Sequence, residues 1–447
     1  MKIMDSNLTQ QTLAYLQKNL SGWEYQVSFH QTESTMLRFA QSNIHQNNRS
    51  VQTSIGIELA RGKRVARTNL DANNFDEIVN SIQSLQSICE TIAENQEFSG
   101  YPEPPSQLEQ VKENPTIDPE EFYDKSLSFF PVYFQQVKNA SLEAYGSFLF
   151  ENFHAACVNS NGLVNQSNSS SVQFQSQIMN GRVSGYSQST AKTIQDLAIE
   201  RVIEESIETC QNGISPATIE PGDYTVFLKP EAVADIVRMM AFISMGTKAI
   251  DEKRSYLSGK LNTKVLDSCL NITEDPLHPK QISMYMDHQG YPHIHPVKMI
   301  QNGVFHDMVF DDKFAKKYNK SNTGNALPGN MGPIPTNLVL ESSTTQDPTE
   351  MISQVEKGIY VTRFWYANPV SPIDGEVTAL TRDGTFWIEN GQMKPVKNLR
   401  YSDNIFEVLS GILAVGNDSR FTGSFFGGTV APSLLCKKMR FTEVLPE

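Results

Sequence analysis

The chain has 447 residues and a net charge of −13, from 37 basic and 50 acidic side chains. The chain is longer than the ~250–300 residues that a single hydrophobic core normally supports, so we expect a soluble globular protein of two or three domains. The basic residues are scattered and no apolar run approaches the ~20 residues that span a bilayer. Neither nucleic acid nor a membrane is therefore expected as a direct partner.

The N-terminus is predicted to be a helix over residues 6–20. It has no continuous apolar core or small-residue cleavage site of a signal peptide, and we expect a cytoplasmic protein. The five cysteines are odd in number and widely spaced, which excludes CxxC motifs and a dense disulfide framework. They are interpreted as buried reduced thiols.

Alternating apolar residues follow the first helix and predict three or four strands up to residue 70. Within them "ARGKRVAR" (60–67) is interpreted as a hairpin with a charged tip. An amphipathic helix follows in 74–95, because its apolar residues recur at intervals of three and four: Ile78, Ile82, Leu85, Ile88 and Ile92. These elements form a predicted N-terminal α/β domain over residues 1–96.

A segment with four prolines and no periodicity, residues 97–118, is predicted to be a linker. The central α+β domain is placed at 119–213. It begins with a helix near Asp118–Pro119, continues with a hairpin turning at Asn161–Gly162, and ends with a helix in 191–213. Gly213 is the expected left-handed cap of that last helix.

The remainder, residues 214–447, is expected to be one β-rich domain. Its hairpin turns are predicted at Asn302–Gly303, Asp383–Gly384 and Asn390–Gly391. The predicted fold class is therefore α+β, in which an antiparallel sheet with packed helices precedes a large β-dominated C-terminal domain.

No GxSxG or HExxH motif occurs, so the histidine-rich segment "DHQGYPHIHP" (287–296) is the most obvious candidate for chemistry. His288, His293 and His295 could bind a metal ion, with His306 completing the shell. The alternative is that these imidazoles are exposed or simply hydrogen-bonded, because Gly290 and Pro292 indicate a turn whose geometry the sequence does not fix.

Several blocks together resemble the TldD/PmbA (TldE) family. They include "YLSGKLNTKVLD" (256–267), "SNTGNALPGNMGPIPTNLVLE" (321–341), "KGIYVTRFWY" (357–366) and "LTRDGTFWIENG" (380–391). The resemblance implies one of two paired cytoplasmic subunits. TldD-like chains carry a zinc-binding HExxxH helix and a distal cysteine, and they hydrolyse unfolded peptides in a closed chamber. TldE/PmbA-like chains lack the metal, and the family was formerly described as modulators of DNA gyrase.

The segment that matches the zinc helix is "IVRMMAFISM" (236–245). Met239 and Met240 stand near the expected His-Glu and Ser244 stands near the second histidine. "SRFTGSFFGGTVAPS" (419–433) likewise has no cysteine. The resemblance therefore implies a metal-free subunit without a cofactor or catalytic residue of its own. Its partner would be a TldD-like chain that holds zinc.

Family blocks in predicted loops supply candidates for a peptide cleft or subunit interface, although their Gly, Asn and Asp residues could equally serve turns. These candidates are Thr323, Gly324, Asn325, Arg363, Tyr366, Arg382 and Asp383. Two other functions stay open. One is an autonomous metal-dependent hydrolase that uses the histidine cluster, and the other is a homodimeric peptide-binding module.

Overall fold

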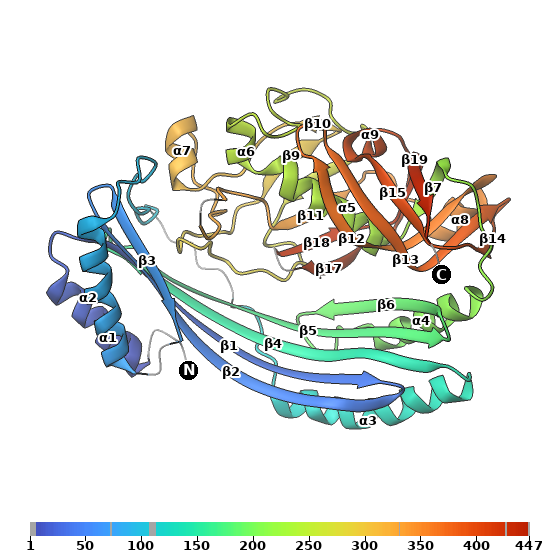
Figure 1. The fold of residues 1–447 in the computed structure, drawn as a ribbon, viewed down its shortest axis with the longest axis horizontal. Coiled ribbons are helices and arrows are strands. Elements are labelled where there is room, and N and C mark those ends of the chain that lie inside the picture. The colour runs from blue at the N-terminus through green and yellow to red at the C-terminus, as the bar shows by residue number, and fades with distance from the viewer. Residues whose placement is uncertain (1–5, 72–73, 107–112, 330, 425–426, 446–447) are drawn as a thin grey trace.

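A computed structural model describes residues 6–71, 74–106, 113–329, 331–424 and 427–445. It confirms the α+β class. The first half is built on one long, curved sheet, and the second half forms a β-rich domain that lies against this sheet (Figure 1). The central part of the predicted linker, 107–112, lies outside the described residues.

The curved sheet is antiparallel, with strand order β3-β2-β1-β4-β5-β6. Its strands are β1 (Glu24–Ala40), β2 (Asn43–Arg61), β3 (Arg64–Leu70), β4 (Glu143–Asn159), β5 (Val164–Asn180) and β6 (Val183–Ala191). The segments 1–96 and 119–213 thus contribute three strands each to one sheet, joined where β1 pairs with β4 from Gln26↔Asn159 to Phe39↔Gly146. The hairpins predicted at "ARGKRVAR" and at Asn161–Gly162 are present.

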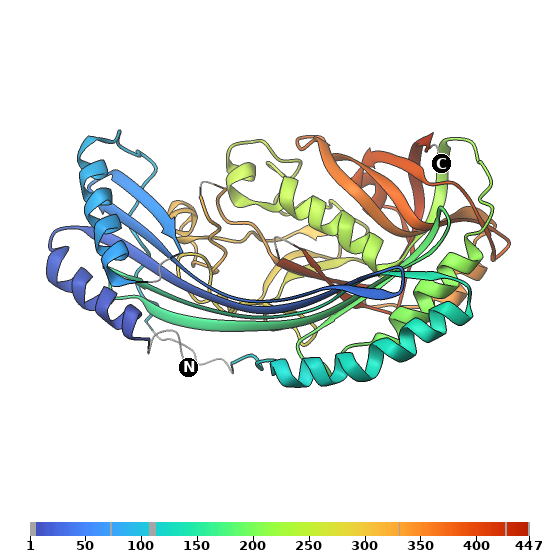
Figure 2. The ribbon, with the colours of Figure 1, turned by 60° about the horizontal axis from the view of Figure 1, so that its bottom comes forward.

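Four helices cover one face of this sheet, as α3 illustrates in Figure 2. They are α1 (Asn7–Asn19), α2 (Phe75–Thr91), α3 (Pro119–Asn139) and α4 (Ile199–Asn212). Strand alternation explains this layering. Phe174 and Ile178 of β5 pack under α3 and α4, whereas Gln177 between them faces the C-terminal domain and bonds to Asp383.

Gly213 is not the left-handed cap that the sequence predicted. Its φ is −83°, and Ser215, two residues later, has the positive φ of +60°. Glycine fits position 213 for a different reason, because a Cβ there would lie 2.9 Å from Cγ1 of Val183. The helix itself begins at Ile199, eight residues into the segment predicted to be helical.

The C-terminal half contains a closed ring of five strands. Pairing runs β12-β7-β19-β15-β13 and returns to β12, so the ring has no free edge along these pairings. The ring strands are β7 (Gly222–Leu228), β12 (Lys357–Ser371), β13 (Glu376–Glu389), β15 (Leu399–Asn404) and β19 (Leu434–Val444). β14 (Gln392–Pro395) extends β13, and β16 (Ile412–Val415) pairs with β19.

A second sheet has the order β10-β9-β8-β11-β18-β17. Its strands are β8 (Asn271–Glu274), β9 (Val297–Gln301), β10 (Val304–Phe305), β11 (Asn337–Glu341), β17 (Arg420–Ser424) and β18 (Gly427–Ala431). The helices of this half are α5 (Pro230–Met240), the π-helix η2 (Ala241–Met245), α6 (Thr247–Asp251), α7 (Asp312–Tyr318), α8 (Pro348–Ser353) and α9 (Ile405–Leu409).

Two of the three predicted turns in this half are confirmed. Asn302–Gly303 joins β9 to β10, and Asn390–Gly391 joins β13 to β14. The hairpin predicted at Asp383–Gly384 is wrong, because both residues lie inside β13. They have positive φ values of +54° and +116° and stand opposite Thr362 alone, which makes them a β-bulge.

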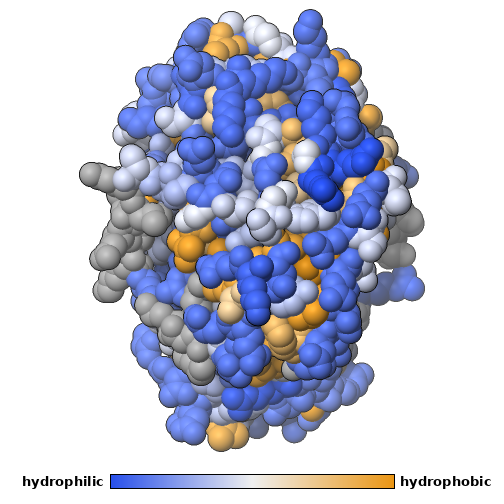
Figure 3. All heavy atoms as spheres, turned by 90° about the vertical axis from the view of Figure 1, so that its left-hand side faces the viewer, coloured by the Kyte–Doolittle hydropathy of each residue, from blue (hydrophilic) through white to orange (hydrophobic). Residues whose placement is uncertain are grey.

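The face shown in Figure 3 is largely hydrophilic, with apolar residues gathered in a zone across its middle. Within the described residues, no helix combines the length and the apolar character needed to cross a membrane. All five cysteines are free thiols, and four of them are buried.

Candidate functional site

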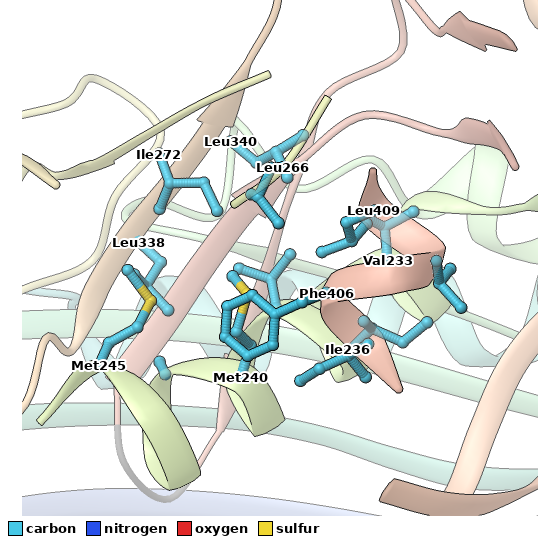
Figure 4. Close-up of a cluster of buried hydrophobic side chains, with 14 of the residues drawn as sticks. Val233, Ile236, Met240, Met245, Leu266, Ile272, Leu338, Leu340, Phe406 and Leu409 are labelled. Carbon is cyan, nitrogen blue, oxygen red and sulfur yellow. The ribbon is translucent and has the colours of Figure 1, made fainter. Parts of the chain in front are cut away.

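Helix α5 and η2 form the centre of the candidate site, because they occupy the segment where the family resemblance places a metal helix. α5 packs against β12 of the ring and against β18 and β17 of the second sheet. Its apolar stripe follows helical spacing and is buried: Val233, Ile236, Val237 and Met240. Met240 and Met245 lie among other core side chains (Figure 4).

The side of α5 and η2 away from this stripe lines a pocket of about 340 Å³. The helix contributes Asp235, Arg238, Met239 and Phe242. The rest of the lining comes from the 327–338 segment, β12 and β18, and it is mainly apolar: Leu327, Ile334, Pro335, Leu338, Ala367 and Pro369, with Thr336, Asn368 and Thr429. Phe242 is 43% exposed.

The two charged residues of the pocket are held by the protein itself. Arg238 pairs with Asp235, and its Nη1 donates to the carbonyl oxygens of Thr422 and Gly423 at 3.3 Å. The other oxygen of Asp235 accepts the backbone N–H of Phe364 at 3.1 Å. Burial raises the pKa of Asp235, and the Arg238 charge opposes that rise. Because both groups are satisfied, neither is positioned as a free acid or base.

A polar atom that lacks a partner lies on the opposite wall. Thr429 of β18 lines the pocket and is fully buried, yet its Oγ1 has no hydrogen-bond partner among the described residues. Its cross-strand neighbour Thr422 is unpartnered in the same way. Buried hydroxyls are normally hydrogen-bonded, so Thr429 is an exception on this wall, and Thr422 is a second exception on β17, outside the pocket lining.

The three positions expected to replace the metal ligands are placed differently. Met239 lines the pocket, whereas Met240 is fully buried in the core. Ser244, in η2, is also fully buried, and its Oγ has no partner. No residue described in the pocket lining is His, Cys or Glu. Short π-helical segments are often found at functional sites, and η2 lies beside this pocket.

The histidine cluster does not assemble a metal site. His293 is buried and its Nε2 lies 2.9 Å from Glu274 Oε1, whereas His295 and His306 are exposed. Burial, with His30 and Arg67 nearby, lowers the pKa of His288 to about 4. Across the described ranges, no three His, Cys, Asp or Glu side chains are arranged to hold a metal ion. The described residues therefore lend no geometric support to the alternative that used these histidines, which stays a prediction.

The candidate residues Thr323, Gly324 and Asn325 belong to a buried network around Glu274. Asn325 is only 3% exposed, and its Nδ2 donates to Glu274 Oε1 at 3.1 Å. Thr323 Oγ1 donates to Asn325 Oδ1 at 2.7 Å. Gly324 has a φ of +74°, and a Cβ there would lie 2.2 Å from the carbonyl oxygen of Pro292. This block fixes a loop against the histidine segment.

The remaining candidates meet where the ring contacts the curved sheet. Arg363 forms a two-nitrogen ion pair with the fully buried carboxylate of Asp383, which also accepts from Ser184 Oγ at 2.6 Å and Gln177 Nε2 at 3.0 Å. The guanidinium of Arg363 lies 3.8 Å from the ring centroid of Tyr186. These contacts join the two halves of the chain.

Arg382 and Tyr366 are more exposed. The guanidinium of Arg382 lies 4.6 Å from the Trp365 ring centroid, and Tyr366 is 75% exposed with a φ of +56°. Trp365 itself is 46% exposed. Exposed aromatic and arginine side chains of this kind are enriched at protein interfaces.

Sequence reasoning missed Asp235, Arg238, Phe242 and Thr429. The first three could have been found from helical spacing, because positions 235, 238 and 242 lie on the side of the helix away from the buried apolar stripe. Thr429 had no local signal, because its place in the pocket depends on β18 lying beside α5.

Family models match both halves of the chain. Residues 221–443 match the PmbA/TldA metallopeptidase C-terminal domain, and residues 25–91 match the PmbA/TldA metallopeptidase domain 1. An uncharacterized protein of Methanocaldococcus jannaschii is 20% identical over 420 residues, covering 93% of this chain and 96% of the relative. A zinc metalloprotease TldD homolog of Saccharolobus solfataricus is 26% identical over 247 residues, about half of each chain.

Solved structures share the fold over nearly the whole length. TldE from Thermococcus kodakarensis has a TM-score of 0.85 at 17% identity, covering 97% of this chain and 100% of that one. A protein from Thermotoga maritima described as a candidate modulator of a DNA gyrase has a TM-score of 0.81 at 21% identity, covering 97% and 99%.

Proposed function

The chain belongs to the PmbA/TldD family of metallopeptidase-related proteins, and from this membership we propose that it is a metal-free, non-catalytic subunit of a TldD/TldE-type peptidase. Its partner is a TldD-like chain that holds zinc and cleaves unfolded peptides. This chain supplies the other wall of the peptide chamber. The fold it shares with the TldE of Thermococcus kodakarensis supports the proposal.

The composition of the α5 pocket carries the argument. A hydrolytic zinc site needs imidazole, thiolate or carboxylate ligands that converge, and a base beside them. The helix instead presents Met239, Phe242 and an internally paired Asp235–Arg238 to the pocket. The residue types that would bind zinc and activate water are replaced by residues that shape an apolar surface.

The cytoplasm is the proposed location. All five cysteines are free thiols although the protein is large enough to hold disulfides, as is usual where thiols are kept reduced.

The proposal is tested by co-expressing this chain with a TldD-like chain of the same organism. We expect a single complex by size-exclusion chromatography with light scattering, and chelator-sensitive cleavage of an unfolded peptide by the complex. The zinc measured by elemental analysis should follow the TldD-like chain. The purified single chain should cleave nothing, and its robust chelator-sensitive proteolysis would refute the proposal.

A matched variant separates this proposal from histidine-based chemistry. His295→Ala removes an exposed imidazole of the cluster without opening the core. Cleavage by the complex should be unchanged in this variant. If no complex with a TldD-like chain forms and the single chain is a stable dimer that binds peptides, the homodimeric binding module replaces the proposed subunit role.

A further inference from the structure

We infer that the α5 pocket binds one apolar side chain of an extended peptide, so that this chain selects substrate by a hydrophobic anchor residue. The inference rests on the proposed function for its biological setting, but the binding itself belongs to this chain. A pocket of about 340 Å³ is at the lower end of the ~300–1,000 Å³ of small-molecule sites, which suits one or two large side chains rather than a cofactor.

The shape of the lining favours an apolar occupant. Phe242 reaches the pocket from η2 while 43% exposed, and Ile334 and Leu338 face it from the segment before and within β11. Among the described lining residues, the only charged ones are Asp235 and Arg238, which pair with each other. A charged side chain entering this pocket would lose its hydration without gaining a free counter-charge.

The unpartnered hydroxyl of Thr429 is the second observation that points to a ligand. This side chain is fully buried and lines the pocket, but its Oγ1 makes no hydrogen bond within the described residues. A buried hydroxyl without a partner is unfavourable, and a peptide amide or carbonyl at the pocket wall would supply one. The site thus combines an apolar cavity with one polar atom left to fix the orientation of a ligand.

The strand beside the pocket mouth indicates that the occupant is extended. β7 pairs with β12 only over 358–361, and no described strand covers the same edge of β12 beyond them. Just beyond this pairing Asp235 of α5 accepts the backbone N–H of Phe364, and further along β12 Ala367 and Pro369 line the pocket, where the ladder to β13 is irregular. A peptide lying along this edge would direct alternate side chains to one side, where one of them can enter the pocket.

The test uses fluorescein-labelled octapeptides of Gly and Ser with Leu, Phe, Ala or Glu at one central position, and measures fluorescence anisotropy with the full chain and with its TldD-like complex. We expect the Leu and Phe peptides to bind about tenfold tighter than the Ala peptide, and the Glu peptide more weakly still. N-acetyl-leucinamide, which has the side chain without the extended backbone, should bind much more weakly than the Leu peptide.

Two variants assign the binding to this pocket. Phe242→Ala should weaken the Leu peptide at least fivefold, whereas Leu413→Ala, which removes a 54% exposed side chain outside the pocket lining, should leave it unchanged. Thr429→Val should raise the melting temperature, because it removes an unpartnered buried hydroxyl, and weaken the peptide. A rise in melting temperature together with a loss of peptide affinity distinguishes a ligand contact from a structural role.

Equal affinity for the Leu and Ala peptides, or equal effects of Phe242→Ala and Leu413→Ala, would overturn the inference. Tight binding of N-acetyl-leucinamide would refute the inference that the ligand is an extended peptide. Unchanged peptide binding by Thr429→Val would show that the Thr429 hydroxyl does not contact the ligand. Failure of the subunit proposal looks different: the single chain would bind Leu peptides but form no complex. A complex that cleaves peptides without preference for an apolar residue would be consistent with the subunit role but would refute the inference that the pocket binds an apolar anchor residue.

Discussion

Replacing Glu205 with glutamine should destabilise the fold by about 3 kcal/mol, because this carboxylate joins α4 to two cations of the C-terminal half. Its oxygens lie 2.9 Å from Lys229 Nζ and 2.8 Å from Arg420 Nη2, and 3.1 Å from Arg201 Nη1 on its own helix. Lys229 precedes α5 directly and Arg420 begins β17. The network therefore holds the candidate site against the curved sheet.

The magnitude follows from what the substitution leaves behind. The side chain of Lys229 is only 8% exposed, so neutralising Glu205 would leave a buried ammonium without its closest counter-charge. Removing one member of a buried pair costs about 3–5 kcal/mol. The Glu205 side chain is 21% exposed, and because water reaches it we expect the lower end of that range.

The effect should also depend on pH. Burial alone would raise the pKa of Glu205, but Lys229, Arg420 and Arg201 hold it well below its usual range. A carboxyl whose folded-state pKa is lowered contributes stability that is present above its unfolded pKa of about 4.3 and is lost as the pH falls further. The difference between wild type and Glu205→Gln should therefore be largest near neutral pH and shrink below about pH 4.

Urea unfolding followed by circular dichroism measures this difference. Glu204→Gln is the matched control, because it removes an exposed carboxylate from the neighbouring position of α4 and should change stability by less than about 0.5 kcal/mol. Adding Lys229→Met to Glu205→Gln should recover part of the loss, because no unpaired ammonium remains. A cost below about 1 kcal/mol, or a double variant as unstable as the sum of its parts, would contradict the reasoning.

Three further predictions follow from other contacts. Gly384→Ala should lower the free energy of unfolding by more than about 2 kcal/mol, since its φ is +116° and its Cβ would meet Thr209 Cγ2 at 2.4 Å. The control Gly181→Ala, with φ +60° and nothing within 4 Å of its Cβ, should cost only about 1 kcal/mol, and thermal melts of both variants measure the difference. Burial raises the pKa of Asp287 to about 7, so stability should fall as the pH rises from about 4 to 7, and Asp287→Asn should flatten that fall in urea midpoints. Arg363→Lys should cost about 1–2 kcal/mol in urea unfolding, because lysine cannot form the two-nitrogen pair that the guanidinium makes; equal stability would mean that the pair is not needed.

Local patterns in the sequence predicted most individual elements but not how they combine. The helices near 6–20 and 74–95 and the hairpins at Asn302–Gly303 and Asn390–Gly391 depend on neighbours in the chain, and they are confirmed. The same reasoning failed at Asp383–Gly384. A dipeptide with two positive φ values serves a bulge as well as a turn, and only the length of the partner strand distinguishes them.

The site was predicted in part for the same reason. Helical spacing identified the buried stripe of α5, and the absence of histidine from 236–245 could be read directly. The pocket on the other side depends on β12 and β18, which are distant in the sequence. The ion pair of Arg363 with Asp383 was not predicted either, although both residues were named, because their strands are brought together by pairing.

The ring of the C-terminal domain also constrains the order in which the chain can fold during translation. β7 is flanked by β12 and β19, and β19 begins 206 residues after β7 ends, from Leu228 to Leu434. At about 5–20 residues per second, a nascent β7 waits roughly 10–40 s for that neighbour. Until then its apolar residues and one row of backbone groups stay open, and this interval is when a chaperone or a mispairing strand would compete for it.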